Sequence, residues 1–95
     1  MTVFAQRVLD AVDRIPRGCV MSYGDVAEYV DMGSARAVGM VMARYGAQVP
    51  WHRVLRADGS CAPGVAQRQL AALRREKVPI RGDRIDMARA RWDGR

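Results

Sequence analysis

Apolar residues recur with helical spacing along much of this 95-residue chain. In residues 2–14 they fall on one face while the charged residues lie off it, which predicts an amphipathic helix. Pro16 and Gly18 end that helix, because proline disfavours a helical conformation in the residue before it and glycine admits a turn. The apolar face consists of Phe4, Val8, Ala11, Val12 and Ile15.

Two short helices joined by a glycine-containing turn are predicted next. Ser22 followed three residues later by Asp25 is typical of a helix N-terminus and predicts a helix over about 23–31. Ser34 is placed to cap a second helix over 35–45. Such a pair forms a helix-turn-helix, with the second helix in the position that meets nucleic acid.

The helix predicted over 35–45 has two unequal faces. One carries the spacing of a buried stripe, formed by Val38, Val41, Met42 and Tyr45. The opposite face is small and almost uncharged, and consists of Arg36, Gly39, Met40 and Ala43. Small residues let a backbone approach a surface closely, and an arginine there can reach into a groove. The same pattern fits a second buried face in a small bundle equally well.

The second half of the chain predicts one more helix. Asp58-Gly59 marks a turn, and residues 60–64 form a loop of small residues. The helix follows over about 65–77. Its apolar residues, expected to be buried, are Val65, Leu70 and Leu73. Its residues expected to be mostly solvated are Gln67, Arg68, Arg74, Arg75 and Glu76.

The last residues fit either a small hairpin around 81–84 or an irregular segment that reaches Trp92. The length allows one domain, 1–95, whose last residues form a basic tail over 78–95. The predicted fold is therefore mainly α, with a helix-turn-helix.

Charge narrows the range of partners. The net charge is +6, but residues 1–33 contribute −2 and residues 34–95 contribute +8, and fifteen of the sixteen basic residues are arginine. This distribution favours a polyanion such as nucleic acid, although an arginine-rich genome would produce it as well. No apolar run approaches the roughly 18 residues of a membrane span, and no signal peptide is recognisable, so we expect a cytoplasmic protein.

Cysteine and histidine are too few for a metal centre. Cys19 and Cys61 form no metal-binding pair, and His52 is the only histidine. We expect no metal, no cofactor and no disulfide. The stretch that remains to be explained is Pro50-Trp51-His52-Arg53-Val54, which by composition alone indicates a rigid, partly buried corner.

The order of the motifs resembles the DNA-binding domain of O6-alkylguanine-DNA alkyltransferases over about residues 3–77. The matching pieces are Ile15-Pro16-x-Gly18, Ser22-Tyr23-Gly24-Asp25-Val26-Ala27, Ala35-Arg36-Ala37-Val38-Gly39 and Pro50-x-His52-Arg53-Val54. The resemblance implies a small winged-helix-like domain that binds double-stranded DNA containing O6-alkylguanine through the minor groove. It also implies that the damaged nucleotide is flipped into a pocket.

One residue departs decisively from that family. The alkyltransferases have cysteine between the proline and the histidine, where its thiolate accepts the alkyl group, whereas this chain has Trp51. An indole offers no such nucleophile, which excludes alkyl transfer at this position. The Pro-Trp-His-Arg form resembles the alkyltransferase-like proteins, which bind these lesions without repairing them and present them to nucleotide-excision repair. We therefore expect a non-enzymatic damage sensor, active as a monomer and associated with the nucleoid when bound to DNA.

The resemblance also implies roles for individual residues. Tyr23 matches the tyrosine that helps to rotate the damaged nucleotide, and Arg36 matches the arginine finger that fills the vacated space. Trp51 is expected to line the base pocket, and Val54 to accept from the guanine amine through its carbonyl. Further DNA contacts are expected from Ser34, Ala35, Ala37, Gly39 and Met40. A structural remnant of the family's active site is expected in His52, Arg53 and Glu76, with a hydrogen bond from His52 to Glu76.

Other departures leave the pocket incompletely assigned. The family usually has an asparagine before the active-site loop, and residues 45–49 contain none. Residues 60–64 also lack the basic residue that often reads the lesion in alkyltransferase-like proteins.

Two other functions are compatible with part of the sequence. Cys61, or less directly Cys19, could act as the alkyl acceptor of an enzyme, although neither has a histidine beside it in sequence. A winged-helix transcription regulator would share the helix-turn-helix. Such regulators read major-groove base edges with long polar side chains, and residues 38–43 offer almost none.

Overall fold

The computed structural model describes all residues, 1–95, and is mainly α-helical. Its helices are α1 (Val3–Arg14), α2 (Tyr23–Val30), α3 (Ala35–Tyr45), α4 (Ala66–Arg75) and α5 (Met87–Ala90). Its strands are β1 (Met21–Ser22), β2 (Val54–Leu55), β3 (Ile80–Arg81) and β4 (Arg84–Ile85). Short 3-10 turns cover Gly46–Gln48 and Trp51–Arg53. None of the helices combines the length and the apolar character needed to cross a bilayer.

The second and third helices begin at the predicted residues and the first begins one residue later, at Val3, and each start has a polar side chain that caps it. The Thr2 hydroxyl accepts from the Ala5 N–H at 3.0 Å, and the Ser34 hydroxyl accepts from the Ala37 N–H at 3.2 Å. Ser22 and Asp25 form the full reciprocal capping box at the start of α2. The α2 helix ends one residue earlier than predicted, because Asp31 takes a left-handed conformation with φ of 56°.

A pair of two-residue strands, which the sequence analysis did not predict, joins the two halves of the molecule. β1 and β2 run parallel, with Met21 opposite Val54 and Ser22 opposite Leu55. Successive side chains of a strand point to opposite sides. Met21 and Val54 therefore enter one apolar cluster, while Leu55 enters the other.

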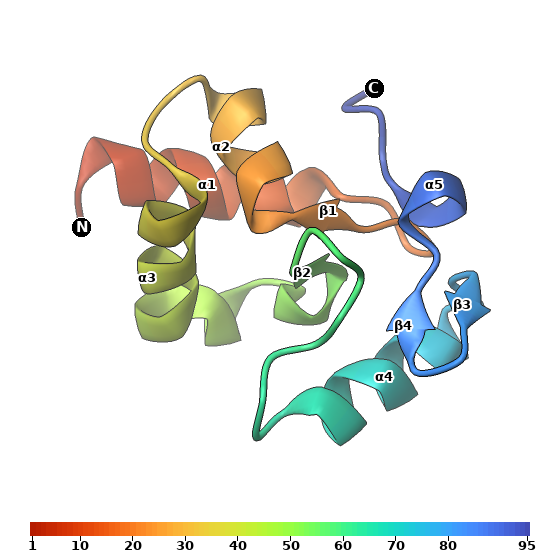
Figure 1. The fold of residues 1–95 in the computed structure, drawn as a ribbon. Coiled ribbons are helices and arrows are strands. Elements are labelled where there is room, and N and C mark those ends of the chain that lie inside the picture. Colours follow the sequence, from red (N-terminus) through yellow and green to blue (C-terminus); the bar gives the residue numbers. More distant parts are fainter.

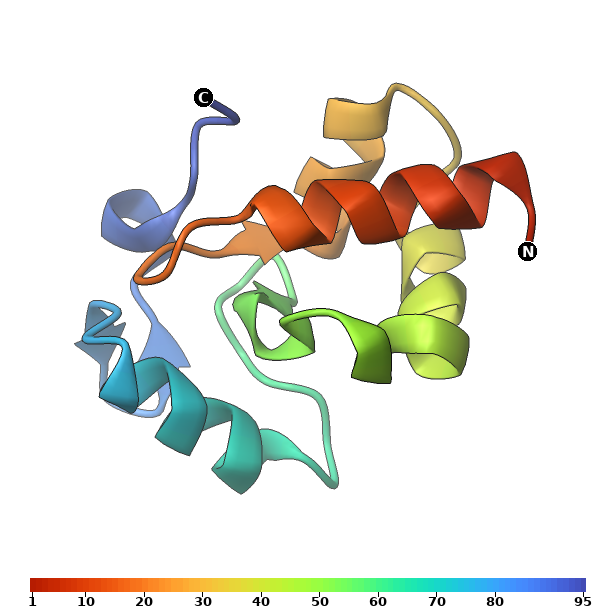
Figure 2. The same ribbon diagram turned by 180° about the vertical axis from the view of Figure 1, so that it is seen from behind.

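Two adjoining apolar cores result. Figures 1 and 2 show the elements that form them, with α1, α2 and α3 on one side of the strand pair and α4 with the C-terminal segment on the other. The first joins α1, α2 and α3 and is built from Val8, Ala11, Val12, Ile15, Met21, Val26, Ala27, Val38 and Val54. The second joins α4 to the C-terminal segment and is built from Val20, Leu55, Leu73, Val78, Ile85 and Ala90. Residues assigned from the sequence to a basic tail thus supply half of the second core.

The C-terminal segment is ordered by its own short elements. β3 and β4 form the hairpin that was one of the two predicted alternatives, with Ile80 opposite Ile85. α5 was not predicted, since four residues carry no periodic pattern. A parallel bridge between Val20 and Arg91 then ties the end of the chain to the residue before β1.

Several predicted exposures are wrong. On α3 only Val38 is buried, whereas Val41, Met42 and Tyr45 are half-buried. Val41 and Met42 pack against the edge of the first core, and Met42 also lines a cavity. The fourth helix spans 66–75 instead of 65–77, and its Leu73 is buried while Val65 and Leu70 are half-buried. Glu76, expected to be solvated, keeps only 7% of its side chain exposed.

Candidate nucleic-acid interface

An open, mostly apolar cavity of about 490 Å³ lies between α3, the two 3-10 turns and the start of α4. It is large enough for a flat aromatic ligand of modest size. Its lining consists of Tyr23, Gly39, Met42, Ala43, Gly46, Ala47, Trp51, Ala62, Val65 and Arg68. The cavity brings together three residues that the sequence analysis assigned to DNA or lesion recognition, namely Tyr23, Gly39 and Trp51.

Trp51 forms one wall of the cavity, and Arg68 lies over its ring. The Arg68 guanidinium carbon is 5.4 Å from the centroid of the Trp51 ring, within the range of a cation–π interaction. Arg68 is the only charged residue in the lining. This role could not be predicted from the sequence, because Arg68 lies outside residues 60–64, in the first turn of α4, where it resembles an ordinary solvated helix residue.

Tyr23 reaches the cavity from the first position of α2. The capping box fixes this helix start, so the side chain leaves the backbone in a defined direction. Burial raises the pKa of the Tyr23 phenol above its usual value, and the nearby Arg56 opposes that rise. The hydroxyl is therefore neutral near pH 7 and available both as a donor and as an acceptor.

The small face of α3 is exposed, which decides between the two interpretations of its sequence. Ser34, Ala35, Arg36, Met40 and Ala43 are exposed, and Ala37 and Gly39 are half-buried. Met40 keeps 68% of its surface, so no second buried face exists. The first turn of α3 also contains no acidic residue. Its free N–H groups and the exposed Arg36 therefore present positive charge at one end of the cavity-lining helix.

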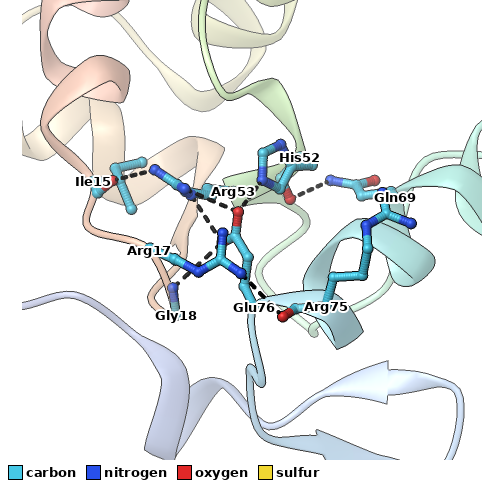
Figure 3. Close-up of polar contacts among 8 residues, drawn as sticks. All are labelled: Ile15, Arg17, Gly18, His52, Arg53, Gln69, Arg75 and Glu76. Carbon is cyan, nitrogen blue, oxygen red and sulfur yellow. Dashed lines mark hydrogen bonds and ion pairs between the residues drawn. The ribbon is translucent and has the colours of Figure 1, made fainter.

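A buried polar network occupies the other side of the same Pro50–Val54 motif (Figure 3). The predicted hydrogen bond is present, with 2.6 Å between His52 Nε2 and Glu76 Oε2. Arg53 donates to both Glu76 carboxylate oxygens at 2.9 Å and to the Ile15 carbonyl at 2.9 Å. The Gly18 N–H donates to Glu76 Oε1 at 3.3 Å.

This network sets the charge of its carboxylate. Burial alone would raise the pKa of Glu76. The hydrogen bonds from Arg53, His52 and the Gly18 N–H more than offset that effect and lower the pKa to about 2. Glu76 is therefore ionised at neutral pH and joins the end of α4 to the loop after α1.

Gln69 is a second residue that the sequence analysis missed. It is 2% exposed, and its Nε2 donates to the His52 carbonyl at 3.1 Å and to the Val54 carbonyl at 2.8 Å. The Val54 carbonyl, assigned to the guanine amine, therefore has an internal partner and one remaining lone pair. No periodic signal distinguishes Gln69, because glutamine in a helix usually faces solvent.

The chain has two free thiols, one buried and one half-buried. Cys61 is buried at 9% exposure, and burial raises the pKa of its thiol above the usual value. Cys19 is half-buried and packs against the first core. Neither cysteine is among the residues that line the cavity.

The fold and this cavity define a class of DNA-binding domain, and comparison with known proteins agrees. The family described as 6-O-methylguanine DNA methyltransferase, DNA binding domain, matches residues 3–78. The chain belongs to this family, as its motifs predicted.

Individual relatives place the chain more narrowly. It is 42% identical over 97 residues to the DNA base-flipping protein of Escherichia coli, covering 95% of this chain and 74% of that protein. It is 41% identical over 87 residues to alkyltransferase-like protein 1 of Schizosaccharomyces pombe, covering 84% of this chain and 81% of that protein. The crystal structure of S. pombe Atl1 in complex with damaged DNA containing O6-carboxymethylguanine matches with a TM-score of 0.85 at 33% identity, over 98% of this chain and 97% of that chain. The predicted mainly α fold is thereby confirmed.

Proposed function

We propose that this chain is a non-enzymatic sensor of O6-alkylguanine in double-stranded DNA. It approaches from the minor groove, flips the damaged nucleotide into the cavity beside Trp51 and leaves the alkyl group in place. The observation that carries the proposal is an open apolar cavity with Tyr23 and Trp51 in its wall and no cysteine in its lining. The likeness to a base-flipping protein and to a complex with damaged DNA supports it.

Each part of the cavity has a physical task in this proposal. Extruding a base from the stack costs a few kcal/mol, and stacking on an aromatic ring recovers about 1–3 kcal/mol. Trp51 supplies that ring, and Arg68, which lies against the same ring, adds the cationic group of the cavity wall. Arg36 enters the duplex and fills the space that the base leaves, while Tyr23 crowds the phosphate of the rotated nucleotide. The Val54 carbonyl accepts from the guanine amine with its free lone pair.

The remaining parts of the proposal concern chemistry and partners. His52, Arg53 and Glu76 act as scaffold, because no thiol beside them needs a proton relay. Cys61 is a poor alkyl acceptor, since burial keeps its thiol protonated. The bound lesion is presented by a monomer to nucleotide-excision repair proteins, in the cytoplasm and on the nucleoid.

The test compares two duplexes that differ only in one O6-methyl group. Fluorescence anisotropy should give tighter binding to the O6-methylguanine duplex than to the guanine duplex. Tyr23→Ala, Arg36→Ala and Trp51→Ala should each reduce this preference, whereas Trp51→Phe, which keeps a ring, should retain most of it. Equal affinity of the wild-type protein for both duplexes would refute damage recognition.

The absence of chemistry is tested separately. Intact-protein mass after incubation with alkylated duplex should be unchanged. A gain of one methyl group would make the protein an enzyme, and Cys61→Ala against Cys19→Ala would then identify the acceptor.

A further inference from the structure

The end of the chain packs against the segment that carries Tyr23. The Val20 N–H donates to the Ala90 carbonyl at 3.0 Å, and the Trp92 N–H donates to the Val20 carbonyl at 2.8 Å. These bonds fix residues 90–92 beside the residue that precedes β1, as Figure 1 shows for α5 and β1. The family match ends at residue 78, so residues 90–92, which contact Val20 here, lie outside the matched region.

A side-chain bond continues the contact into the helix start itself. Arg91 Nε donates to Asp25 Oδ2 at 2.9 Å, and the same oxygen accepts from the Ser22 N–H at 2.9 Å. Asp25 is therefore shared between the capping box of α2 and the C-terminal segment. Its side chain is 20% exposed, so the pair is partly shielded from water.

Aromatic packing holds the same segment on the outer side of α2. The Trp92 and Tyr29 rings lie with centroids 5.5 Å apart and planes tilted by 36°. Gly94 has φ of 85°, and a Cβ there would lie 3.2 Å from the Tyr29 ring, so the chain passes this ring at close range. Together the backbone bonds, the ion pair and the rings attach residues 90–94 to both ends of α2.

We propose that residues 87–95 form a brace that positions Tyr23 for lesion recognition, with Arg91 as the positioning residue. Arg91 acts through Asp25, which fixes the first turn of α2 and hence the direction in which Tyr23 enters the cavity. This inference rests on the proposed function. The competing role for Arg91, whose side chain is 47% exposed, is a direct bond to a DNA phosphate.

Salt dependence separates the brace from a phosphate contact. Arg91→Ala should lower the preference for the O6-methylguanine duplex over the guanine duplex about threefold to tenfold. The slope of log affinity against log salt should stay unchanged, because no phosphate contact is lost. If Arg91 instead binds a phosphate, affinity for both duplexes falls alike and the slope decreases by about one. That result would overturn the proposal.

A matched control and a double-mutant cycle separate positioning from stability. Arg89→Ala removes the same charge from α5, where the Arg89 side chain makes no ion pair or hydrogen bond, and should leave the preference unchanged. Arg91→Lys, which can still pair with Asp25, should restore much of it. In a Tyr23→Ala background, Arg91→Ala should produce no further loss of preference. Additive losses would contradict the brace.

The outcomes also distinguish a failure of the brace from a failure of the proposed function as a damage sensor. A wild-type protein without lesion preference refutes the proposed function, whereas a preference that survives Arg91→Ala refutes only the brace. Thermal unfolding should show each variant folded, since partly exposed ion pairs contribute little to stability. If Arg91→Ala does not fold, Arg91→Gln replaces it in the same cycle.

Discussion

Trp51 and His52 are neighbours in the chain but belong to regions of opposite character. Trp51 borders an open cavity whose lining is apolar except for Tyr23 and the exposed Arg68. His52 joins a buried network in which every hydrogen bond of Glu76 is made within the protein. No buried side-chain nitrogen or oxygen in the protein lacks a hydrogen-bond partner.

Within the five residues Pro50–Val54, Trp51 therefore belongs to the proposed binding site and His52 to the scaffold that supports it. A cavity that accepts a base must be empty and partly exposed, so it contributes little to stability. A buried charge must be fully partnered, so its network is rigid and its loss destabilises the fold. We therefore expect substitutions in the network to change stability, and substitutions in the cavity to change binding.

The largest expected effect comes from removing the charge at the centre of the network. Glu76→Gln leaves Arg53 without a counter-ion and should lower the free energy of unfolding by about 3 kcal/mol. Urea unfolding of the wild type and of Glu76→Gln measures this loss of stability. Glu28→Gln on the exposed face of α2 is the matched control and should change stability by less than about 0.5 kcal/mol. A loss as small for Glu76→Gln would contradict the assignment of the network as scaffold.

The pH dependence of the same network is the next largest effect. The folded pKa of Glu76, about 2, lies below its usual value of 4.5, so the unfolded chain binds the proton more tightly. The stabilisation is therefore complete above about pH 5.5 and is lost as the pH falls towards 2. The difference in unfolding free energy between wild type and Glu76→Gln should shrink by about 2 kcal/mol between about pH 5.5 and about pH 3. A difference that stays constant over this range would show that Glu76 is not held ionised by the network.

The helix-turn-helix could be predicted from local sequence pattern, whereas the hydrogen bond between His52 and Glu76 could be predicted only through the family resemblance. Capping residues such as Ser22 and Ser34 act within a few positions of themselves, so a local pattern locates the helices. The burial of Glu76 depends on Arg53 and His52, more than twenty positions earlier. Nothing in Arg74-Arg75-Glu76-Lys77 distinguishes it from a solvated helix end.

The residues around the cavity also differ in how far they could be predicted from the sequence. Tyr23 and Trp51 could be assigned because they stand within motifs that resemble a known family. Arg68 and Gln69 could not, since their partners are the Trp51 ring and two backbone carbonyls that only the fold brings near. The β1–β2 pair could not be predicted either, because strands of two residues are too short to show an alternating pattern.

Gln69 holds the backbone of the Pro50–Val54 motif in place through hydrogen bonds to the His52 and Val54 carbonyls. The contribution of these bonds to stability can be measured. Gln69→Met keeps the shape of the side chain but leaves the His52 and Val54 carbonyls without their donor, which should destabilise the fold by about 2 kcal/mol. Gln67→Met, at an exposed position of the same helix, is the control and should have almost no effect on urea unfolding. An equal effect of the two substitutions would mean that water replaces the Gln69 amide.

Arg68 provides the smallest effect and the sharpest test of the cavity side. Its cation–π contact with Trp51 is exposed, and such contacts contribute about 0.5–1 kcal/mol. Arg68 is also the charged residue of the cavity lining and can make a cation–π contact of the same size with a flipped base, so Arg68→Ala should weaken binding to an O6-methylguanine duplex about threefold more than binding to the guanine duplex. Arg74→Ala removes the same charge from an exposed position of α4, and should weaken binding to both duplexes alike. If the two substitutions reduce the lesion preference equally, Arg68 acts through its net charge and not through its position over the Trp51 ring. Arg74→Ala should leave the free energy of unfolding unchanged, whereas Arg68→Ala should lower it by about 0.5–1 kcal/mol, because it removes the contact with the Trp51 ring.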